Sequence, residues 1–310
     1  MLNRLVIGSR GSPLALCQAD WARTALLLAN PGLEVRIDVI RTKGDHELNL
    51  PVARIGGKRV FTREIEEALL DGRIDMAVHS LKDLPTRLPR GLRLAAISRR
   101  WDVRDALVSR NGHTLENLPE GSVVGTGSLR RQAQLRHIRP DLRVEGIRGN
   151  VDTRLRKLDA GEIEAVVLAA AGLHRLGLAG RASEFLSAKH FLPAPGQGAL
   201  GIEIRHGDSR LERAVGCLHD RSTDSAVGAE RAMLDKLEGG CQVPIGAWAR
   251  LCDGCLVADG IVALPDGGKV VRARTTGEAD ASGEVGRRLA GLLIERGAKE
   301  ILGEASKAAG

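Results

Sequence analysis

The chain of 310 residues contains no tyrosine, and aromatic residues make up only 2% of it. Proteins that bind single-stranded nucleic acid stack bases on aromatic side chains, and this composition offers poor platforms for that. Long apolar runs are also missing: AVVLAAAGL at 165–173 has about half the length of a membrane-spanning helix. The first residues, MLNRLVIGSRGS, hold too short an apolar run for the core of a signal peptide. We therefore expect a cytoplasmic protein with no membrane partner.

Cysteine is sparse, with five residues, and this odd number in an apparently intracellular chain predicts no disulfide framework. Cys252 and Cys255 form a single CxxC pair, so a tetrahedral zinc site would need ligands from elsewhere. The Asp253-Gly254 dipeptide between them is typical of a hairpin turn. The pattern favours a β-hairpin over a metal or redox site, and we expect no bound metal.

Basic residues outnumber acidic ones, 46 to 39, which gives a formal net charge of +7. Such a charge is compatible with nucleic-acid binding. The basic residues are mostly arginine, however, and several stand beside Gly, Ser and Thr turns instead of in one run. Arginine suits bidentate recognition of carboxylate or phosphate. A small polyanionic ligand therefore fits the pattern better than a duplex.

Two segments share one pattern: VIGSRGSPLAL and SVVGTGSLRRQ each predict a strand, a glycine, a Ser/Thr-rich turn and a helix. Each turn presents backbone N–H groups and a helix N-terminus to an anion. In the first segment, Ser12 is the expected N-cap and Pro13 the first helical residue. Helical spacing predicts an apolar stripe on this first helix, made of Leu14, Cys17, Trp21, Ala25 and Leu28.

A second repeat follows, because GRIDMAVHSLKD at 72–83 and GEIEAVVLAAAG at 161–172 each predict a helix-ending glycine and a hydrophobic strand. The first unit is longer than the second. Much of its extra length lies in TKGDHELNLPVARIGGKRVFT, which is polar, Gly-rich and basic. We expect this stretch to be a mobile loop.

These repeats predict an α/β protein with two periplasmic-binding-protein-like lobes around a cleft, plus a small α+β C-terminal domain. Ligands of such sheets bind beyond the carboxyl ends of the strands. FLPAPGQGALGIEI, 191–204, is the expected linker and alternating strand that return the chain to the first lobe. We place the first lobe at 1–99 and 199–217, the second at 104–193, and the third domain at 221–310.

HSLKDLPT, 79–86, places Ser80, Lys82 and Asp83 at the carboxyl end of the predicted strand DMAV. The second repeat has an alanine and a glycine where the first has Lys82 and Asp83, so this charged pair occurs in one lobe only. A solvated turn with a Lys–Asp pair is one interpretation. The asymmetry favours a catalytic group, in which Asp83 bonds a substrate N–H and moves protons.

Several arginines fall independently at strand ends and helix starts, on the expected side of the cleft: Arg10, Arg130, Arg131, Arg148, Arg154 and Arg175. Arg148 is expected to end the strand RVEGI, and Arg175 to follow the strand AVVLA. Between them, Asn150 caps the predicted helix that bears Arg154. A single arginine is usually a solvated surface charge. Their convergence indicates a ligand with several carboxylates.

EGGCQVPIG, 238–246, places Cys241 between two glycines and a Gln-Val-Pro sequence. The glycines end a helix, and the proline keeps the preceding valine out of the helical region. Buried structural cysteines more usually lie in periodic apolar segments. Cys241 is therefore predicted on a loop that a small molecule can reach.

The motifs IGSRGSPLAL, HSLKDLPT, GTGSLRRQAQL, IRGNVDTRL, LAAAGLHRLG, PAPGQGAL and EGGCQVPIGAWA are together highly specific. Through them the chain resembles the porphobilinogen deaminase (hydroxymethylbilane synthase) family along essentially its whole length. The resemblance implies head-to-tail condensation of four porphobilinogen molecules, with loss of ammonia, to hydroxymethylbilane in haem and porphyrin biosynthesis. It also implies a covalent dipyrromethane cofactor, attached by a thioether to Cys241.

The same resemblance implies roles for individual residues, with Asp83 as the general acid/base and a contact of the cofactor. The other residues implied in binding the cofactor are Ser12, Lys82, Thr126, Ser128, Arg130 and Arg131. Those implied in binding substrate are Arg10, Ser80, Arg148, Arg154, Arg175 and Gln197. Lys58 and Phe61 belong to the loop that would cover the site. We expect a monomer that takes porphobilinogen as its small-molecule partner and binds no nucleic acid.

Two other classes of protein share some of these features. A solute-binding protein also has two α/β lobes and a cleft, but it would carry an export signal and no anchoring cysteine. A nucleic-acid binder would use the positive charge, and its affinity for DNA would depend steeply on salt. Lost affinity for porphobilinogen on mutation of the arginines would favour the enzyme.

Overall fold

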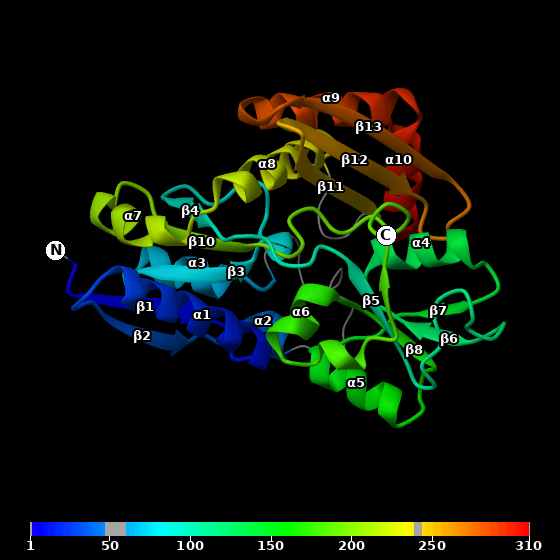
Figure 1. Ribbon diagram of the computed structural model, residues 1–310, viewed down its shortest axis with the longest axis horizontal. Helices are drawn as coiled ribbons and strands as arrows, with labels where there is room; N and C mark the ends of the chain where they lie inside the picture. The colour runs from blue at the N-terminus through cyan, green and yellow to red at the C-terminus, as the bar shows by residue number, and fades with distance from the viewer. Residues whose placement is uncertain (1, 47–59, 239–243, 310) are drawn as a thin grey trace. The chain divides into compact units, whose positions relative to one another are not determined.

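The computed structural model describes residues 2–46, 60–238 and 244–309. The chain divides into two compact units (Figure 1). The first unit comprises Met1–Trp101 and Ala199–Asp224, and the second comprises Asp102–Gly198 and Ser225–Gly310. Among the described residues, the first unit holds one five-stranded sheet, and the second holds a five-stranded and a three-stranded sheet.

The sheet of the first unit has the strand order β2-β1-β3-β10-β4. Its strands are β1 (Arg4–Ser9), β2 (Glu34–Val39), β3 (Met76–Ser80), β4 (Leu92–Ile97) and β10 (Leu200–Arg205). β1 is parallel to β2 and β3, whereas β10 runs antiparallel to both β3 and β4. The segment 191–204 therefore does return the chain to the first sheet, as the sequence predicts.

Helices cover both faces of this sheet. α1 (Pro13–Ala29) and α7 (Ser209–Val215) pack on one face, and α3 (Arg63–Leu70) packs on the other. The remaining helical segments are α2 (Lys43–His46), η2 (Leu81–Asp83) and η4 (Gly216–Leu218). β10 alternates as predicted in that Leu200, Ile202 and Ile204 pack into one core, but its other face is buried as well, because helices cover both faces of the sheet. Even Glu203 is buried, with its Oε2 atom 2.9 Å from Nε2 of His79.

α1 begins as the sequence predicts, but the face that it buries is only partly the predicted one. Ser12 is its N-cap and accepts a hydrogen bond from the backbone N–H of Ala15, and Pro13 is its first residue. The predicted stripe is right only in part: Trp21 and Ala25 pack, partly buried, against the core, but Leu28 is 80% exposed. The fully buried residues are Gln18, Ala19, Ala22 and Leu26. Alanines let the helix lie close to the sheet, and Gln18 is satisfied by a hydrogen bond to Ser80.

The five-stranded sheet of the second unit repeats this topology, with the order β7-β6-β8-β5-β9. Its strands are β5 (Asp105–Ser109), β6 (Val123–Gly125), β7 (Arg143–Glu145), β8 (Ala165–Ala169) and β9 (Glu184–Leu186). Here β5 takes the place of β10, antiparallel to both of its neighbours. The helices of this part are α4 (Leu129–Ile138), α5 (Val151–Asp159), α6 (Ala170–Arg175) and η3 (Ala179–Arg181). Gly72 and Gly161 both have left-handed φ values, +73° and +76°, which confirms the predicted repeat of a helix-ending glycine before a strand.

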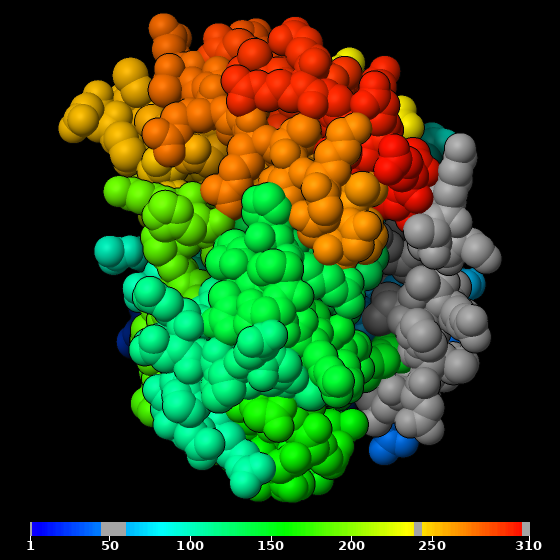
Figure 2. All heavy atoms as spheres, turned by 90° about the vertical axis from the view of Figure 1, so that its right-hand side faces the viewer, coloured from blue at the N-terminus to red at the C-terminus, as the bar shows by residue number. Residues whose placement is uncertain are grey.

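The last part of the chain forms an antiparallel sheet of β11 (Ile245–Cys252), β12 (Cys255–Ala263) and β13 (Val270–Glu278). Its helices are α8 (Arg221–Lys236), η5 (Ala279–Ala281), α9 (Ser282–Glu295) and α10 (Ala298–Ala309). α8, α9 and α10 share one apolar core with this sheet. α10 was not predicted from the sequence. The turn after β12 contacts α4, where Arg136 donates to the carbonyl of Pro265 at 2.7 Å. In Figure 2, orange atoms of this last part lie directly against green atoms of the same unit.

The CxxC pair flanks a two-residue hairpin turn, as predicted. Cys252 pairs with Cys255 across the β11–β12 ladder, and Asp253 and Gly254 have φ values of +50° and +79°. Positive φ at both central residues is the signature of a type I′ turn. In the described residues, no group of three or more His, Cys, Asp or Glu side chains is arranged to hold a metal. Nor does any helix of the described chain have the length and apolarity needed to cross a bilayer. The predicted fold class, two α/β sheets with a small α+β part, is confirmed.

Gly286 marks the closest approach of α9 to α8, and it yields a test of this packing. A Cβ atom at Gly286 would overlap the carbonyl oxygen of Ala229, whereas one at Gly291, also on α9, meets open space. We expect Gly286→Ala to lower the free energy of unfolding by about 1–3 kcal/mol through overpacking. Gly291→Ala should raise it by about 0.5–1 kcal/mol through helix propensity. Urea unfolding measures both, and equal stabilities would contradict the close approach.

Candidate active site

Polar residues of the first unit follow β3 directly. Ser80 ends β3, and Lys82 and Asp83 lie in η2, which confirms their predicted place at a strand end. The turn is fixed to the rest of the first unit, because Leu81 is buried and its N–H donates to the carbonyl of Ala199 at 3.0 Å. Asp83 is exposed. Its carboxylate is therefore accessible to a ligand.

Arg10 and Ser12 follow the neighbouring strand β1. Since β1 and β3 are adjacent and parallel, their carboxyl ends meet at one edge of the sheet. The Arg10 guanidinium lies over the ring of Phe61, 4.3 Å from its centroid. Ser12 is half-buried at the start of α1. The edge therefore combines one exposed carboxylate with cationic and hydroxyl donors. Lys58 and Cys241 lie outside the described residues.

In the second unit, the corresponding edge lies beyond β6 and β7. Thr126 follows β6 and is fully buried, and Ser128 stands at the N-cap position of α4, where its side chain makes no capping hydrogen bond. Asn150 caps α5 as predicted, accepting from the N–H of Thr153 at 2.9 Å. On the same helix, Arg154 donates from Nε to the carbonyl of Gly149 at 2.9 Å. These groups gather at the N-termini of α4 and α5.

Two arginines of this unit lie elsewhere than the sequence predicts. β7 ends at Glu145, so Arg148 lies in the turn before α5 instead of ending a strand. Arg175 does not follow β8 directly but ends α6, because Ala170 and Leu173 are buried and continue the chain as a helix. Its Nη2 atom donates to the carbonyl of Gly198 at 2.8 Å.

The first turn of α4 holds Arg130 and Arg131, which are buried, with exposed fractions of 4% and 5%. They surround Asp105, a residue that was not predicted from the sequence. Both bond Asp105 of β5: Arg130 reaches Oδ2 at 2.7 Å, and Arg131 reaches Oδ1 at 2.7 Å. Gln197 is also fully buried, and its Nε2 donates to Oδ1 of Asp105 at 3.0 Å. In this structure Gln197 therefore holds Asp105 rather than facing outward. The available signal was an aspartate inside the apolar strand DALVS, since buried charges are paired.

This cluster has two guanidinium groups and one carboxylate, so it keeps a net positive charge. Burial alone would raise the pKa of Asp105, but the charges and hydrogen bonds of Arg130 and Arg131 outweigh it and hold the pKa far below its ordinary value. Burial lowers the pKa of Arg130, and Asp105 opposes that effect. Within the described chain, Nε of Arg130 is buried without a hydrogen-bond partner. The cluster therefore keeps one positive charge that Asp105 does not neutralise, and one N–H donor, Nε of Arg130, that Asp105 does not bind.

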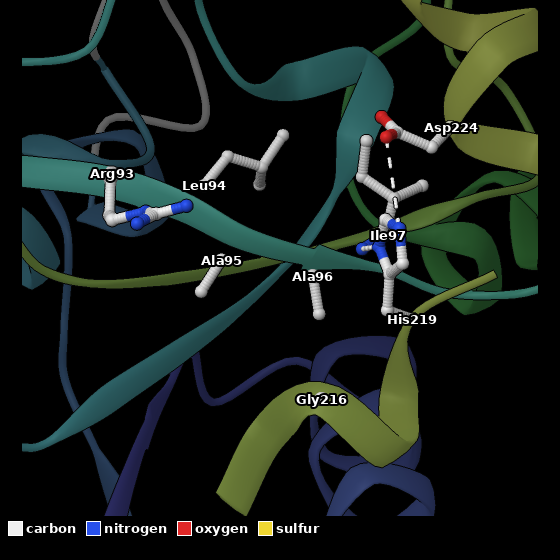
Figure 3. Close-up of a pocket in the computed structure, with 8 residues that line it drawn as sticks. All are labelled: Arg93, Leu94, Ala95, Ala96, Ile97, Gly216, His219 and Asp224. Atoms are coloured by element: carbon white, nitrogen blue, oxygen red, sulfur yellow. Dashed lines mark hydrogen bonds and ion pairs between the residues drawn. The ribbon is translucent and has the colours of Figure 1, made fainter. Parts of the chain in front are cut away.

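A cavity of about 400 Å³ in the first unit contains none of the predicted site residues. Its lining comes from β4, the segment after α7 and the start of α8, and comprises Arg93, Leu94, Ala95, Ala96, Ile97, Gly216, His219 and Asp224 (Figure 3). The N–H of Ile97 donates to Nδ1 of His219 at 3.3 Å, and Nε2 of His219 lies 3.7 Å from Asp224. β4 is separated from β3 by β10 in the sheet, and no residue that follows β1 or β3 lines this cavity.

Comparison with family models gives two matches. The model described as "Porphobilinogen deaminase, dipyromethane cofactor binding domain" matches residues 5–213. The model described as "Porphobilinogen deaminase, C-terminal domain" matches residues 225–295. Together they span both compact units.

Curated relatives carry the same name. Porphobilinogen deaminase of Syntrophobacter fumaroxidans is 48% identical over 309 residues, which cover 99% of this chain and 100% of the relative. Porphobilinogen deaminase of Syntrophotalea carbinolica is 51% identical over 300 residues, covering 97% of this chain and 95% of the relative.

Solved structures give weaker matches. An ancestral arginine-binding protein bound to arginine aligns with 70% of this chain and 92% of its own, at 20% identity and a TM-score of 0.36. An arginine-specific periplasmic binding protein of Salmonella typhimurium aligns with the same shares, at 15% identity and a TM-score of 0.39. Scores of this size carry no functional information.

Asp105 should be essential to the stability of the second unit. Asp105→Asn leaves two buried guanidinium groups without a counter-charge, so we expect the free energy of unfolding at pH 7 to fall by about 3–5 kcal/mol. The control is Asp102→Asn, which breaks a half-exposed pair with Arg104 and should cost no more than about 1 kcal/mol. Urea unfolding compares the two. A small loss for both variants would show that the buried cluster does not stabilise the unit.

The same cluster sets the response to acid. The folded pKa of Asp105 is lowered, so the unfolded state binds more protons at this group. Its stabilisation is complete above the unfolded pKa of about 3.9 and is lost as the pH falls below that value toward the folded pKa. Between about pH 4 and pH 2, wild type should lose stability more steeply than Asp105→Asn.

Proposed function

The chain belongs to the porphobilinogen deaminase family, and from that premise we propose how its residues carry out the reaction. The enzyme is a transferase that joins porphobilinogen molecules head to tail, with loss of ammonia, to give hydroxymethylbilane in tetrapyrrole biosynthesis. Its cofactor is dipyrromethane. We assign Asp83 as the acid/base of the reaction because it is exposed beyond β3, at the sheet edge that it shares with Arg10 and Ser12.

The donors of the chain suit a cofactor and substrate that are rich in carboxylates. The cluster around Asp105 keeps a net positive charge, Nε of Arg130 lacks a partner within the described chain, and the Ser128 side chain makes no capping hydrogen bond to α4. When bound, dipyrromethane supplies the pyrrole position to which the first substrate ring is joined. We assign its attachment to Cys241, and the binding of carboxylates in the second unit to Thr126, Ser128, Arg130, Arg131, Arg148, Arg154 and Arg175.

In the first unit, Asp83 handles protons and charge. Its carboxylate accepts a hydrogen bond from a pyrrole N–H and stabilises the positive charge that develops as ammonia leaves the substrate. Since the pyrrole ring carries this charge in the transition state but not in the bound substrate, the interaction accelerates the reaction instead of merely tightening binding. Lys82, Ser80, Ser12 and Arg10 bind substrate carboxylates there. Lys58 and Phe61 belong to the segment that covers the site.

The organisation of the whole chain is part of the proposal. We assign three domains, at 1–99 with 199–217, at 104–193, and at 221–310, and the three separate sheets support this division. The protein acts in the cytoplasm as a monomer, with no nucleic-acid or membrane partner. The low aromatic content supports the exclusion of single-stranded nucleic acid.

Attachment of the cofactor is tested by intact mass. The purified protein should exceed its sequence mass of 33.1 kDa by two porphobilinogen units less two ammonias, and peptide mapping should place the addition on Cys241. Cys241→Ser should lack the addition. Cys217→Ser, which removes another exposed thiol, should keep it. An active protein of unmodified mass, or an addition on Cys217 or Cys252, would refute the assignment.

The role of Asp83 is tested by turnover of porphobilinogen. Asp83→Asn keeps the shape and one acceptor but loses the charge and the proton, so turnover should fall at least about 10²-fold. Asp83→Glu keeps a displaced charge and should be slightly more active than Asp83→Asn. The control Asp71→Asn alters an exposed aspartate paired with Arg73 in the same unit and should turn over normally. If fully loaded Asp83→Asn comes within a few-fold of wild type, Asp83 is not the acid/base.

A further inference from the structure

Glu230, in α8, is a buried carboxylate outside the residues assigned above. It is 1% exposed. Its Oε2 atom accepts from the N–H of Gly196 and its Oε1 atom from the N–H of Ala249 in β11, each at 2.7 Å. All three residues belong to the second unit. Each oxygen thus meets a backbone donor, and hydrogen bonds to a charged acceptor are the strong kind.

The bond between Glu230 and Gly196 joins two parts of the chain that match different domain models. Glu230 and Ala249 lie within 225–295, which the C-terminal domain model matches, and Gly196 lies within 5–213, which the cofactor-binding domain model matches. Nearby, the N–H of Ala247 donates to the carbonyl of Pro193 at 2.9 Å. Glu230 therefore provides a charged link between the two matched regions.

The segment held by Glu230 leads directly to the arginines. Gly196 and Gly198 have left-handed φ values of +76° and +93°, a conformation that glycine permits but does not enforce. Between them, Gln197 donates to Asp105, which holds Arg130 and Arg131. The carbonyl of Gly198 accepts from Arg175. The Glu230 carboxylate thus fixes the main chain at Gly196, and the next two residues, Gln197 and Gly198, contact Asp105 and Arg175.

We propose that Glu230 is a positioning residue for carboxylate binding, acting through Gly196 on Gln197 and Gly198. That segment positions Asp105, and through it Arg130 and Arg131, and it also positions Arg175. The inference rests on the proposed role of these arginines in binding carboxylates of cofactor and substrate. Glu230 itself touches neither.

Glu230→Gln tests the inference in the holoenzyme. The amide replaces one acceptor oxygen by a donor that faces a backbone N–H, so one of the two bonds is lost. At a temperature where circular dichroism shows each variant folded, we expect KM for porphobilinogen to rise about tenfold and kcat to change less than about threefold. The matched control is Glu184→Gln, whose carboxylate accepts from the N–H of Leu115 at 2.7 Å in the same unit. Its KM should stay at the wild-type value, and an equal rise there would overturn the proposal.

A double-mutant cycle asks whether Glu230 acts through Gln197. Gln197→Ala should also raise KM, and Glu230→Gln with Gln197→Ala should lie within about twofold of the larger single effect. A KM equal to the product of the two single effects would overturn the coupling. If Glu230→Gln does not fold, Gly196→Ala replaces it, because alanine is strained at this φ and displaces the N–H that Glu230 holds. An unchanged KM in Gly196→Ala would likewise overturn the proposal.

Arg175→Leu separates failure of this inference from failure of the proposed function. If Arg175→Leu raises KM and Glu230→Gln does not, the arginine binds carboxylates and the role of Glu230 is refuted. If Arg175→Leu has wild-type KM, the premise has failed and the inference falls with it. A rise in KM for both, with Glu184→Gln unchanged, supports the inference.

Discussion

Two arginines and one aspartate in the interior of the second unit constrain much of what surrounds them. Three buried charges would be costly if any were unpaired. The chain meets this cost by placing Asp105 in β5 between Arg130 and Arg131 of α4. The same guanidinium groups also bond the carbonyls of Leu192 and Val167. The ion cluster therefore ties a helix, two strands and the segment after β9 together, and it leaves a net positive charge beside the N-terminus of α4.

The two five-stranded sheets have similar turns at similar edges, but the residues at those edges differ. In each sheet, the first two strands of the order, β2 and β1 or β7 and β6, are parallel neighbours, and the fourth, β10 or β5, runs antiparallel to both of its neighbours. The residues after β3 are Leu81, Lys82 and Asp83, whereas those after β8 continue as the buried start of α6. Repetition of the fold places similar turns after β1 and β6, whereas the residues after β3 and β8 differ: those after β3 include the exposed Asp83, and those after β8 form the buried start of a helix.

Much of the site could be predicted because its signals are local. Ser12 and Asn150 cap their helices as expected, since N-cap preference depends on a few adjacent residues. The Asp253-Gly254 turn forms for the same reason. Asp105 and Glu230 were missed because their roles depend on partners far away along the chain: Asp105 bonds Arg130, 25 residues on, and Glu230 bonds Gly196, 34 residues back. No periodicity or motif in a single sequence contains that information.

The sequence by itself determined the repeated order of strand, turn and helix, the place of Asp83 at a strand end and the membership of the family. Each of these depends on short stretches whose backbone preferences act over a few residues. Only the tertiary structure decided that Arg130 and Arg131 turn inward, that α1 buries alanines and Gln18 instead of Leu28, and that Gln197 holds Asp105. The physical reason is burial: a charged or amide side chain enters the interior only where distant segments supply its counter-charge and its hydrogen-bond partners.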